Sequence, residues 1–219
     1  MRSFFAQELD ILNNDLIKMG SLVESLIEDA IKSLMTKDTQ LAKDTIVRDD
    51  EVDAMEKSIE ARCLQLLLKQ HPVAGDLRLI SSILKMITDL ERIGDQAQDI
   101  AEISLLLADE KFIKELTHIP QMGEATIKML KNSIDAFVNK NQDLAYEVIA
   151  FDDVVDNLFD VIKEELIEII SKNVEHGQQA LDFLMIAKYL ERIGDHAENI
   201  AEWVLFSITG KHVTGKMDN

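Results

Sequence analysis

Apolar residues recur at steps of three and four along most of the chain, a pattern typical of amphipathic helices. Between residues 4 and 71 the chain has no proline and one glycine, Gly20. The first apolar stripe consists of Leu9, Leu12, Leu16, Met19, Val23, Leu26, Ile27 and Ala30. It predicts a long helix that ends at the polar residues 36–39, which offer a turn and a helix cap.

The apolar pattern then resumes twice in the first half of the chain. It predicts a second helix over about residues 39–70 and a third helix from Asp76 to about Leu107. Residues 71–75 separate the two and contain Pro72. Proline interrupts a helix because it lacks an amide donor and restricts the residue before it. No stretch alternates apolar and polar residues in the manner of a half-buried strand.

The same order of residues then occurs a second time. Met19-Gly20, Leu41-Ala42 and Asp49 reappear 103 residues later as Met122-Gly123, Leu144-Ala145 and Asp152. Residues 90–102 (LERIGDQAQDIAE) match residues 190–202 (LERIGDHAENIAE) at ten of thirteen positions, with an offset of 100. The offset changes between the second and third helices of each unit, where Pro72 and Gly177 predict loops.

The sequence therefore predicts an all-α fold, a tandem repeat of two three-helix bundles with six long antiparallel helices. We expect the first bundle over residues 1–116, the second over residues 117–210, and a short tail over residues 211–219. The joint lies near residues 117–120. Helices of about 30 residues would be about 45 Å long, which suits an elongated bundle better than a small globule.

Composition and charge limit the kinds of partner. The 219 residues include 41 acidic and 23 basic side chains, for a formal net charge of −18. This excess repels nucleic-acid phosphates and anionic lipids, so we expect no nucleic-acid partner. No apolar run approaches the roughly 20 residues of a membrane span, so we expect no membrane insertion. The single cysteine, Cys63, excludes an internal disulfide and favours a reducing, cytoplasmic location.

Acidic residues at four-residue steps are the most informative candidates for chemistry. Each step advances about 40° around a helix, so the carboxylates line one stripe. In the first unit they are Asp49, Asp53, Glu91, Asp95 and Asp99. In the second they are Asp152, Asp156, Glu191 and Asp195, with Asn199 in the fifth place. Acids at this spacing repel each other on an isolated helix, so their repetition favours a use for the charge.

On neighbouring helices of a bundle these carboxylates can converge into a metal site. Carboxylate oxygens suit iron, manganese, magnesium or calcium, and suit zinc less well where His and Cys are absent. The other interpretation is a solvated face, since most acidic side chains are exposed. Gly94 and Gly194 lie inside the stripes and indicate close approach of a neighbouring helix, a bulky ligand or a simple packing role.

Other residues give weaker signals. His196 follows Asp195 directly, but adjacent helical residues point about 100° apart, which disfavours His196 as a ligand. Cys63 and Trp203 fall at helical spacing among apolar residues and are expected in the core. Neither of the helices that carry a LERIGD segment contains the Glu-x-x-His motif of di-iron bundles, which disfavours redox chemistry. We find no phosphate-binding loop and no nucleophile elbow, so we expect no catalytic activity.

Together these residues resemble the PhoU family of bacterial phosphate-uptake regulators. The resemblance rests on the two LERIGD segments, the two Asp-x-x-x-Asp pairs, the repeated Met-Gly and residues 72–78 (PVAGDLR). It covers almost the whole chain and implies two similar three-helix bundles side by side. It also implies a cytoplasmic negative regulator of phosphate uptake and of starvation genes. Its implied partners are the ATPase subunit of the phosphate transporter and the sensor histidine kinase, and long amphipathic helices favour a homodimer.

The resemblance also implies metal binding, because some members of the family bind clusters of metal ions, often iron. The implied ligands are Asp49, Asp53, Glu91 and Asp95 in the first unit and Asp152, Asp156, Glu191 and Asp195 in the second, with Asp99 and Asn199 as a further ligand in each. Because Asn199 replaces an acid, the second site is expected to bind metal more weakly. Residues 72–78 have no counterpart in the second repeat, so the two units are expected to differ in partner contacts.

Three functions follow from the sequence as alternatives. The first is a regulatory adaptor, which the duplicated bundle, the lack of a catalytic set and the resemblance favour. The second is a carboxylate-bridged metalloenzyme that hydrolyses phosphate esters at a two-metal site. The third is a structural helical dimer whose acidic stripes are solvated.

Overall fold

The computed structural model describes residues 2–70 and 72–213. Its helices are α1 (Arg2–Thr36), α2 (Thr39–Gln70), α3 (Gly75–Leu107), α4 (His118–Asn139), α5 (Gln142–Lys172), the short 3-10 helix η1 (Val174–His176) and α6 (Gly177–Thr209). No strand occurs in these two ranges. The all-α prediction with six long helices is confirmed. Of the tail expected over residues 211–219, residues 214–219 lie outside the described residues.

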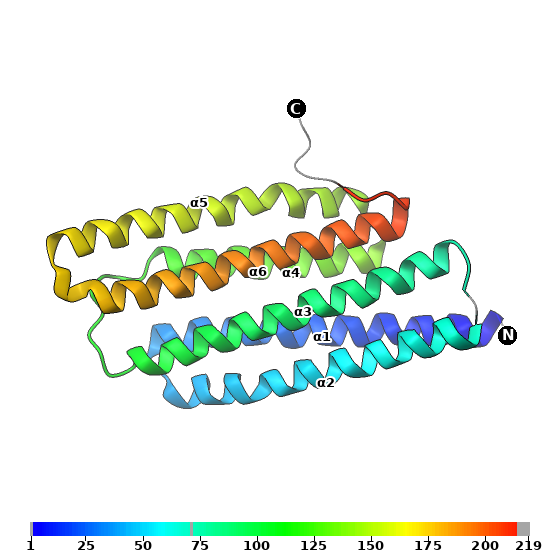
Figure 1. The fold of residues 1–219 in the computed structure, drawn as a ribbon, viewed down its shortest axis with the longest axis horizontal. Helices are drawn as coiled ribbons and strands as arrows, with labels where there is room; N and C mark the ends of the chain where they lie inside the picture. The colour runs from blue at the N-terminus through cyan, green and yellow to red at the C-terminus, as the bar shows by residue number, and fades with distance from the viewer. Residues whose placement is uncertain (1, 71, 214–219) are drawn as a thin grey trace.

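The helices form four layers, which Figure 1 shows from the side. Within the described ranges, α2 packs only on α1 and α3, and α5 packs only on α4, α6 and η1. The contact between the units is made by α3 with α6 and by α1 with α4. The two bundles therefore lie side by side, as predicted, with α2 and α5 as the outer layers.

The turn between the first and second helix has the same design in both units. Lys37 has a φ of 56°, and the Asp38 side chain accepts hydrogen bonds from two backbone amides in the first turn of α2, at 3.0 and 3.1 Å. In the second unit Lys140 has a φ of 49°, and the Asn141 side chain accepts one from α5 at 3.2 Å. The cap and turn predicted at residues 36–39 are confirmed.

The second unit differs from the expectation at two points. The helix α4 has 22 residues and is about 33 Å long, shorter than expected, because residues 108–117 connect the units without a long helix. The loop predicted at Gly177 lies just before it, and Gly177 itself is helical with a φ of −58°. Pro120 lies in the first turn of α4, where its missing amide breaks no helical hydrogen bond.

Gln179 of α6 fixes the connection between the two units. Its side chain is 6% exposed. Its Oε1 accepts a hydrogen bond from the backbone amide of Ile113 at 2.6 Å. Its Nε2 donates to Glu110 Oε2 at 2.6 Å and to the Lys111 carbonyl at 3.3 Å. One buried amide therefore satisfies three polar groups of the connection.

We expect Gln179→Ala to lower the free energy of unfolding by about 2 kcal/mol, because it removes three hydrogen bonds, one of them to a carboxylate, and leaves the half-buried amide of Ile113 without this partner. Urea unfolding followed by circular dichroism measures the change. The matched control is Gln178→Ala, since Gln178 is exposed and makes a single long contact, 3.4 Å from Asp182. Equal stability of the two variants would contradict the anchoring role.

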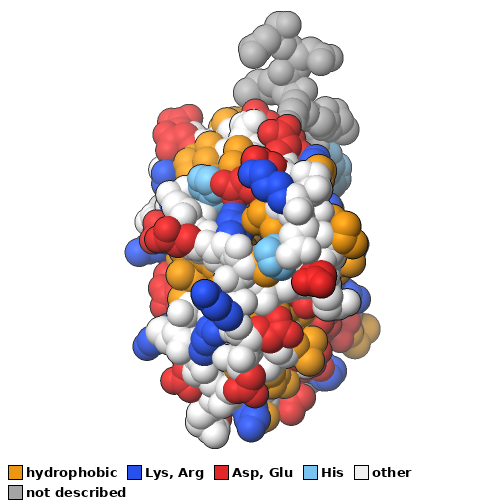
Figure 2. Space-filling model, turned by 90° about the vertical axis from the view of Figure 1, so that its left-hand side faces the viewer, with side chains coloured by type: hydrophobic (Ala, Val, Ile, Leu, Met, Phe, Trp, Pro, Cys, Tyr) orange, Lys and Arg blue, Asp and Glu red, His pale blue; other side chains and the backbone are white. Residues whose placement is uncertain are grey.

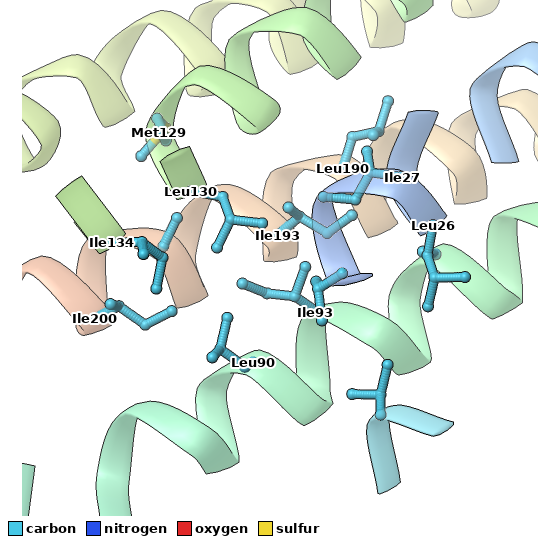
Figure 3. Close-up of a cluster of buried hydrophobic side chains, with 14 of the residues drawn as sticks. Leu26, Ile27, Leu90, Ile93, Met129, Leu130, Ile134, Leu190, Ile193 and Ile200 are labelled. Carbon is cyan, nitrogen blue, oxygen red and sulfur yellow. The ribbon is translucent and has the colours of Figure 1, made fainter. Parts of the chain in front are cut away.

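The two units share one hydrophobic core. Figure 3 shows Ile93 of α3 and Ile193 of α6 pointing toward each other, with Leu130 of α4 and Ile27 of α1 beside them. All four side chains are at most 1% exposed. The apolar side of the duplicated LERIGD segment is therefore the contact between the units, and its acidic side faces away from this core.

The repeated Met-Gly pair is explained by the crossing of α1 and α4. A Cβ atom at Gly20 would lie 3.1 Å from Cγ1 of Ile134, and one at Gly123 would lie 3.0 Å from Cγ1 of Ile31. The contacts are reciprocal, since each glycine receives the isoleucine of the other unit. Each glycine therefore allows the two first helices to approach closely.

Candidate functional site

The acids of the first unit gather where α2 crosses α3, and we call Asp49, Asp53, Glu91 and Asp95 the first acidic face. Asp49 is 8% exposed. Burial, followed by the charges of Asp95, Asp53 and Glu91, raises the pKa of the Asp49 carboxyl to about 7. Burial and the charge of Asp95 also raise the pKa of Glu91. The structure thus brings together the four acids that the sequence separates by up to 46 positions.

The glycines in the acidic stripes allow the outer helices to approach. A Cβ atom at Gly94 would lie 2.6 Å from Oδ1 of Asp49 and 3.3 Å from Val52. At Gly194 the corresponding distances are 3.1 Å to Oδ1 of Asp152 and 3.2 Å to Val155. Of the three explanations considered for these glycines, close approach of a neighbouring helix agrees with these distances.

The second acidic face, Asp152, Asp156, Glu191 and Asp195, lies where α5 crosses α6. Asp152 is 5% exposed. Partial desolvation and the charge of Glu191 raise the pKa of Asp195, and the ammonium of Lys188 opposes this shift. Lys188 also forms an ion pair with Glu191. The second face therefore carries a basic side chain of its own.

The carboxylates of the two faces do not form a closed metal site in this arrangement. Within the described residues, no three His, Cys, Asp or Glu side chains are arranged to hold a metal ion. Arg92 lies 3.4 Å from Glu91 and 3.0 Å from Asp95, and Lys57 lies 2.9 Å from Asp53. Basic side chains thus contact three of the four acids of the first face.

The donor chemistry of the first face nevertheless suits a hard cation. All four groups are carboxylates, and repulsion among them already raises the pKa of the buried Asp49. Within the described ranges no basic side chain or hydrogen-bond donor is paired with Asp49. A divalent ion beside Asp49 would offset this repulsion, provided that Arg92 and Lys57 move aside.

Asp99, Asn199 and His196 have partners in the opposite unit. Asp99 is hydrogen-bonded by Tyr189 and attracted by Arg192 of α6. Asn199 Nδ2 donates to Oδ1 of Asp89 at 3.4 Å, and His196 Nδ1 lies 2.9 Å from the same oxygen. These residues connect α3 with α6 and form a polar seam beside the shared core. The structure therefore gives Asp99 and Asn199, both expected as ligands, contacts between the units.

Two acidic residues near these sites were not predicted from the sequence. Glu56 lies near the first face, where burial, followed by the charges of Glu60 and Asp53, raises its pKa. Asp89 is the acceptor of the polar seam. The equivalent residues of the second unit are Phe159 and Tyr189, which are not acidic. Comparison of the two copies therefore does not identify Glu56 or Asp89. The spacing of Glu56, seven residues after Asp49, was the available signal.

Cys63 and Trp203 were both expected in the core. Cys63 is fully buried, and burial raises the pKa of its thiol to about 12, so it is an unreactive core residue, as predicted. Trp203 is only partly buried and lines a cavity between α3, α6 and the chain after α6. The core prediction is therefore correct for Cys63 and incomplete for Trp203.

Charges of both signs are mixed at one end of the bundle. Figure 2 shows acidic and basic side chains interspersed on the end of the bundle where α5 passes into α6. The described helices include none with the length and apolar character needed to cross a lipid bilayer. On the two acidic faces, by contrast, neighbouring acids raise the pKa values of Asp49 and Asp195.

Fold and site together define the class of protein, a duplicated three-helix bundle with a shared core and one acidic face on each unit. The PhoU domain matches residues 16–104 and 119–204, so both units carry it. The chain belongs to the PhoU family.

Related proteins and structures extend over almost the whole chain. The phosphate-specific transport system accessory protein PhoU homolog of Clostridium acetobutylicum is 42% identical over 97% of both chains. The Escherichia coli accessory protein PhoU is 33% identical over 96% of this chain and 89% of its own. The crystal structure of PhoU from Pseudomonas aeruginosa superposes with a TM-score of 0.91 at 35% identity and covers 94% of this chain and all of its own. The expected family and fold are confirmed.

Proposed function

We propose that this protein is an accessory regulator of phosphate uptake. The observation that carries the proposal is full-length similarity to relatives named phosphate-specific transport system accessory proteins, at up to 42% identity. Both PhoU domains are present and the core between them is continuous. A regulator needs surfaces rather than a catalytic centre, so we assign no enzymatic activity to either acidic face.

In finer detail, we propose a cytoplasmic adaptor that restrains phosphate uptake and the phosphate-starvation genes while phosphate is plentiful. It would contact the ATPase subunit of the phosphate transporter and the phosphate-sensing histidine kinase, and it would act as a homodimer. The two units differ in ways that suit two different partners. The segment of residues 72–78, which leads into α3 and includes its first residues, has no counterpart in the sequence of the second unit; in it Val73 is 74% exposed and Leu77 is 44% exposed.

Deletion of the gene tests the regulatory role. We expect starvation genes to be expressed in high phosphate in the deletion strain, and an intact copy of the gene to restore repression. Repression that persists in the deletion strain would overturn the proposal. Pull-down of the ATPase and the kinase with the intact protein, compared with a Val73→Asp and Leu77→Asp double variant, tests the adaptor role separately.

We also propose that the acidic faces bind a hard cation, either iron or another such as manganese, magnesium or calcium, with zinc the least favoured. The buried carboxylate of Asp49 and the repulsion that the other acids of the first face exert on it support this proposal. Asp49, Asp53, Glu91 and Asp95 would hold the ion in the first unit, and Asp152, Asp156, Glu191 and Asp195 in the second. Bound metal would cross-link α2 to α3 and α5 to α6.

Elemental analysis tests the metal proposal. We expect untagged protein, dialysed against manganese, to retain metal, and a Glu91→Gln and Glu191→Gln double variant to retain at most about one tenth as much, since each face loses a charged ligand. The control is Glu51→Gln and Glu168→Gln, which removes two exposed acids outside the faces. Equal metal content in all three proteins would favour the solvated interpretation of the acids.

A further inference from the structure

A cavity of about 300 Å³ lies at one side of the polar seam, between the two units. Lys85 and Asp89 line it from α3, Asn199, Glu202 and Trp203 from α6, and His212 from the chain after α6. The volume is at the lower end of the range of small-molecule sites. Both units contribute walls, so a molecule bound there would contact both.

The aromatic wall of the cavity is held in place by the chain after α6. Gly210 ends α6 with a φ of 73°, and the chain turns back so that the His212 ring stacks on Phe206 at 4.2 Å. The same ring meets the Trp203 indole edge to face at 5.3 Å. Trp203 thus lines the cavity with a ring that packs edge to face against both Phe206 and His212.

The charged groups of the cavity are of two kinds, those already paired and those not. Asp89 is paired with His196 and Asn199. Within the described residues neither Lys85 nor Glu202 has an ion pair or hydrogen bond, and Lys85 makes only a distant contact, 5.9 Å from the centre of the Trp203 ring. Glu202 is partly buried; this burial raises the pKa of its carboxyl, the nearby His212 opposes the shift, and Asp89 adds to it. The exposed ammonium of Lys85 and the half-buried carboxylate of Glu202, neither of them in an ion pair or hydrogen bond among the described residues, therefore accompany one aromatic ring.

We propose that this cavity binds a small zwitterion of the amino-acid class. The carboxylate of Glu202 receives the cationic end of the ligand, the ammonium of Lys85 receives its anionic end, and the indole of Trp203 stacks on a flat cationic group such as guanidinium. A ligand with only an amine would leave Lys85 unpaired and place a second positive charge beside it. A ligand with only a carboxylate would be repelled by the carboxylates of Glu202 and Asp89. A ligand with both charges satisfies every unpaired group in the cavity.

Three probes on the unmodified protein test the charge requirement. L-arginine has both charges, agmatine is the same molecule without the carboxylate, and propionate has no cation. Trp203 is the single tryptophan of the chain, so its fluorescence reports on this cavity alone. We expect a saturable change with L-arginine and at least about tenfold weaker binding of agmatine and propionate, because each lacks one charge-assisted contact.

Two variants assign the contacts. Glu202→Gln should raise the Kd for L-arginine about tenfold, whereas Glu102→Gln, at the equivalent exposed position of α3, should leave it unchanged. Lys85→Met should remove the preference for L-arginine over agmatine. Circular dichroism of each variant checks that the fold is retained.

The proposal is overturned by three results. These are no saturable response of Trp203 or of calorimetric heat to L-arginine, equal binding of agmatine and L-arginine to the unmodified protein, and unchanged affinity in Glu202→Gln. The first two are measured without any substitution. The test does not involve gene regulation or metal, so its failure leaves the proposed function intact.

Discussion

Replacing Asp49 with asparagine should raise the free energy of unfolding of the metal-free protein at pH 8 by up to about 4 kcal/mol. The folded-state pKa of Asp49 is about 7, against an ordinary value of 3.8, and a tenfold change in proton affinity corresponds to about 1.4 kcal/mol. At pH 8 the folded protein must hold a charged Asp49 under Gly94, among three other acids. Asparagine removes this charge and keeps the shape of the side chain.

The sign of the pH dependence follows from which state binds the proton. Between about pH 4 and pH 7 the folded protein keeps a proton on Asp49 that the unfolded chain has lost. The contribution of Asp49 to stability therefore falls as the pH rises through this window and stays low above it. At pH 4 the unmodified protein and the Asp49→Asn variant should have nearly equal stability.

Urea unfolding in the presence of a chelator, at pH 4, 6 and 8, measures the difference between the two proteins. The control is Glu51→Gln, an exposed acid two positions away on the same helix, which should show little difference at any pH. Excess manganese should reduce the difference in the free energy of unfolding between Asp49→Asn and the unmodified protein, because the ion offsets the same repulsion. A difference in the free energy of unfolding that does not vary with pH would show that the pKa of Asp49 is not raised in the folded protein.

Replacing Gly94 with valine should lower the free energy of unfolding by about 3 kcal/mol through overpacking. A Cβ atom alone would lie 2.6 Å from Oδ1 of Asp49, and the two added methyl groups have to displace α2 from α3. The displacement also separates Asp49 and Asp53 from Glu91 and Asp95. Metal content should therefore fall together with stability.

The matched control is Gly177→Ala, which differs in the space available. No atom lies within 4 Å of a Cβ built at Gly177, whose φ of −58° is helical. This substitution should stabilise the protein by about 0.5–1 kcal/mol, because alanine favours the helix and restricts the unfolded chain. Urea midpoints compare the two variants, and a Gly94→Val protein as stable as the parent would exclude tight packing of α2 on α3.

Most of the fold was predictable because helix position, cap and face are local properties. The bounds of α2 and α3 follow from apolar spacing and from the break at Pro72, and both agree with the structure within one residue. The capped turn at residues 36–39 follows from Asp38. The length of α4 was not predictable, because residues 108–117 are held by Gln179, which lies more than 60 positions away along the chain.

The candidate site was predictable only for acids that occur in both copies. Repetition identified the four acids of each face, and the raised pKa of Asp49 shows that those of the first face interact. It could not identify Glu56 or Asp89, whose counterparts are Phe159 and Tyr189. Whether the faces bind metal stays a prediction, which the elemental analysis decides.

By itself the sequence determined the six helices, their duplication, and the side of each helix that carries acids, because the direction of a side chain around a helix depends only on its position. The tertiary structure decided which residues each side chain contacts. It turned Asp99, Asn199 and His196 toward the opposite unit, buried Asp49 under Gly94, and placed Trp203 at a cavity between the units. These contacts arise where α2 crosses α3 and where α3 crosses α6, and the packing of the whole shared core sets both crossings.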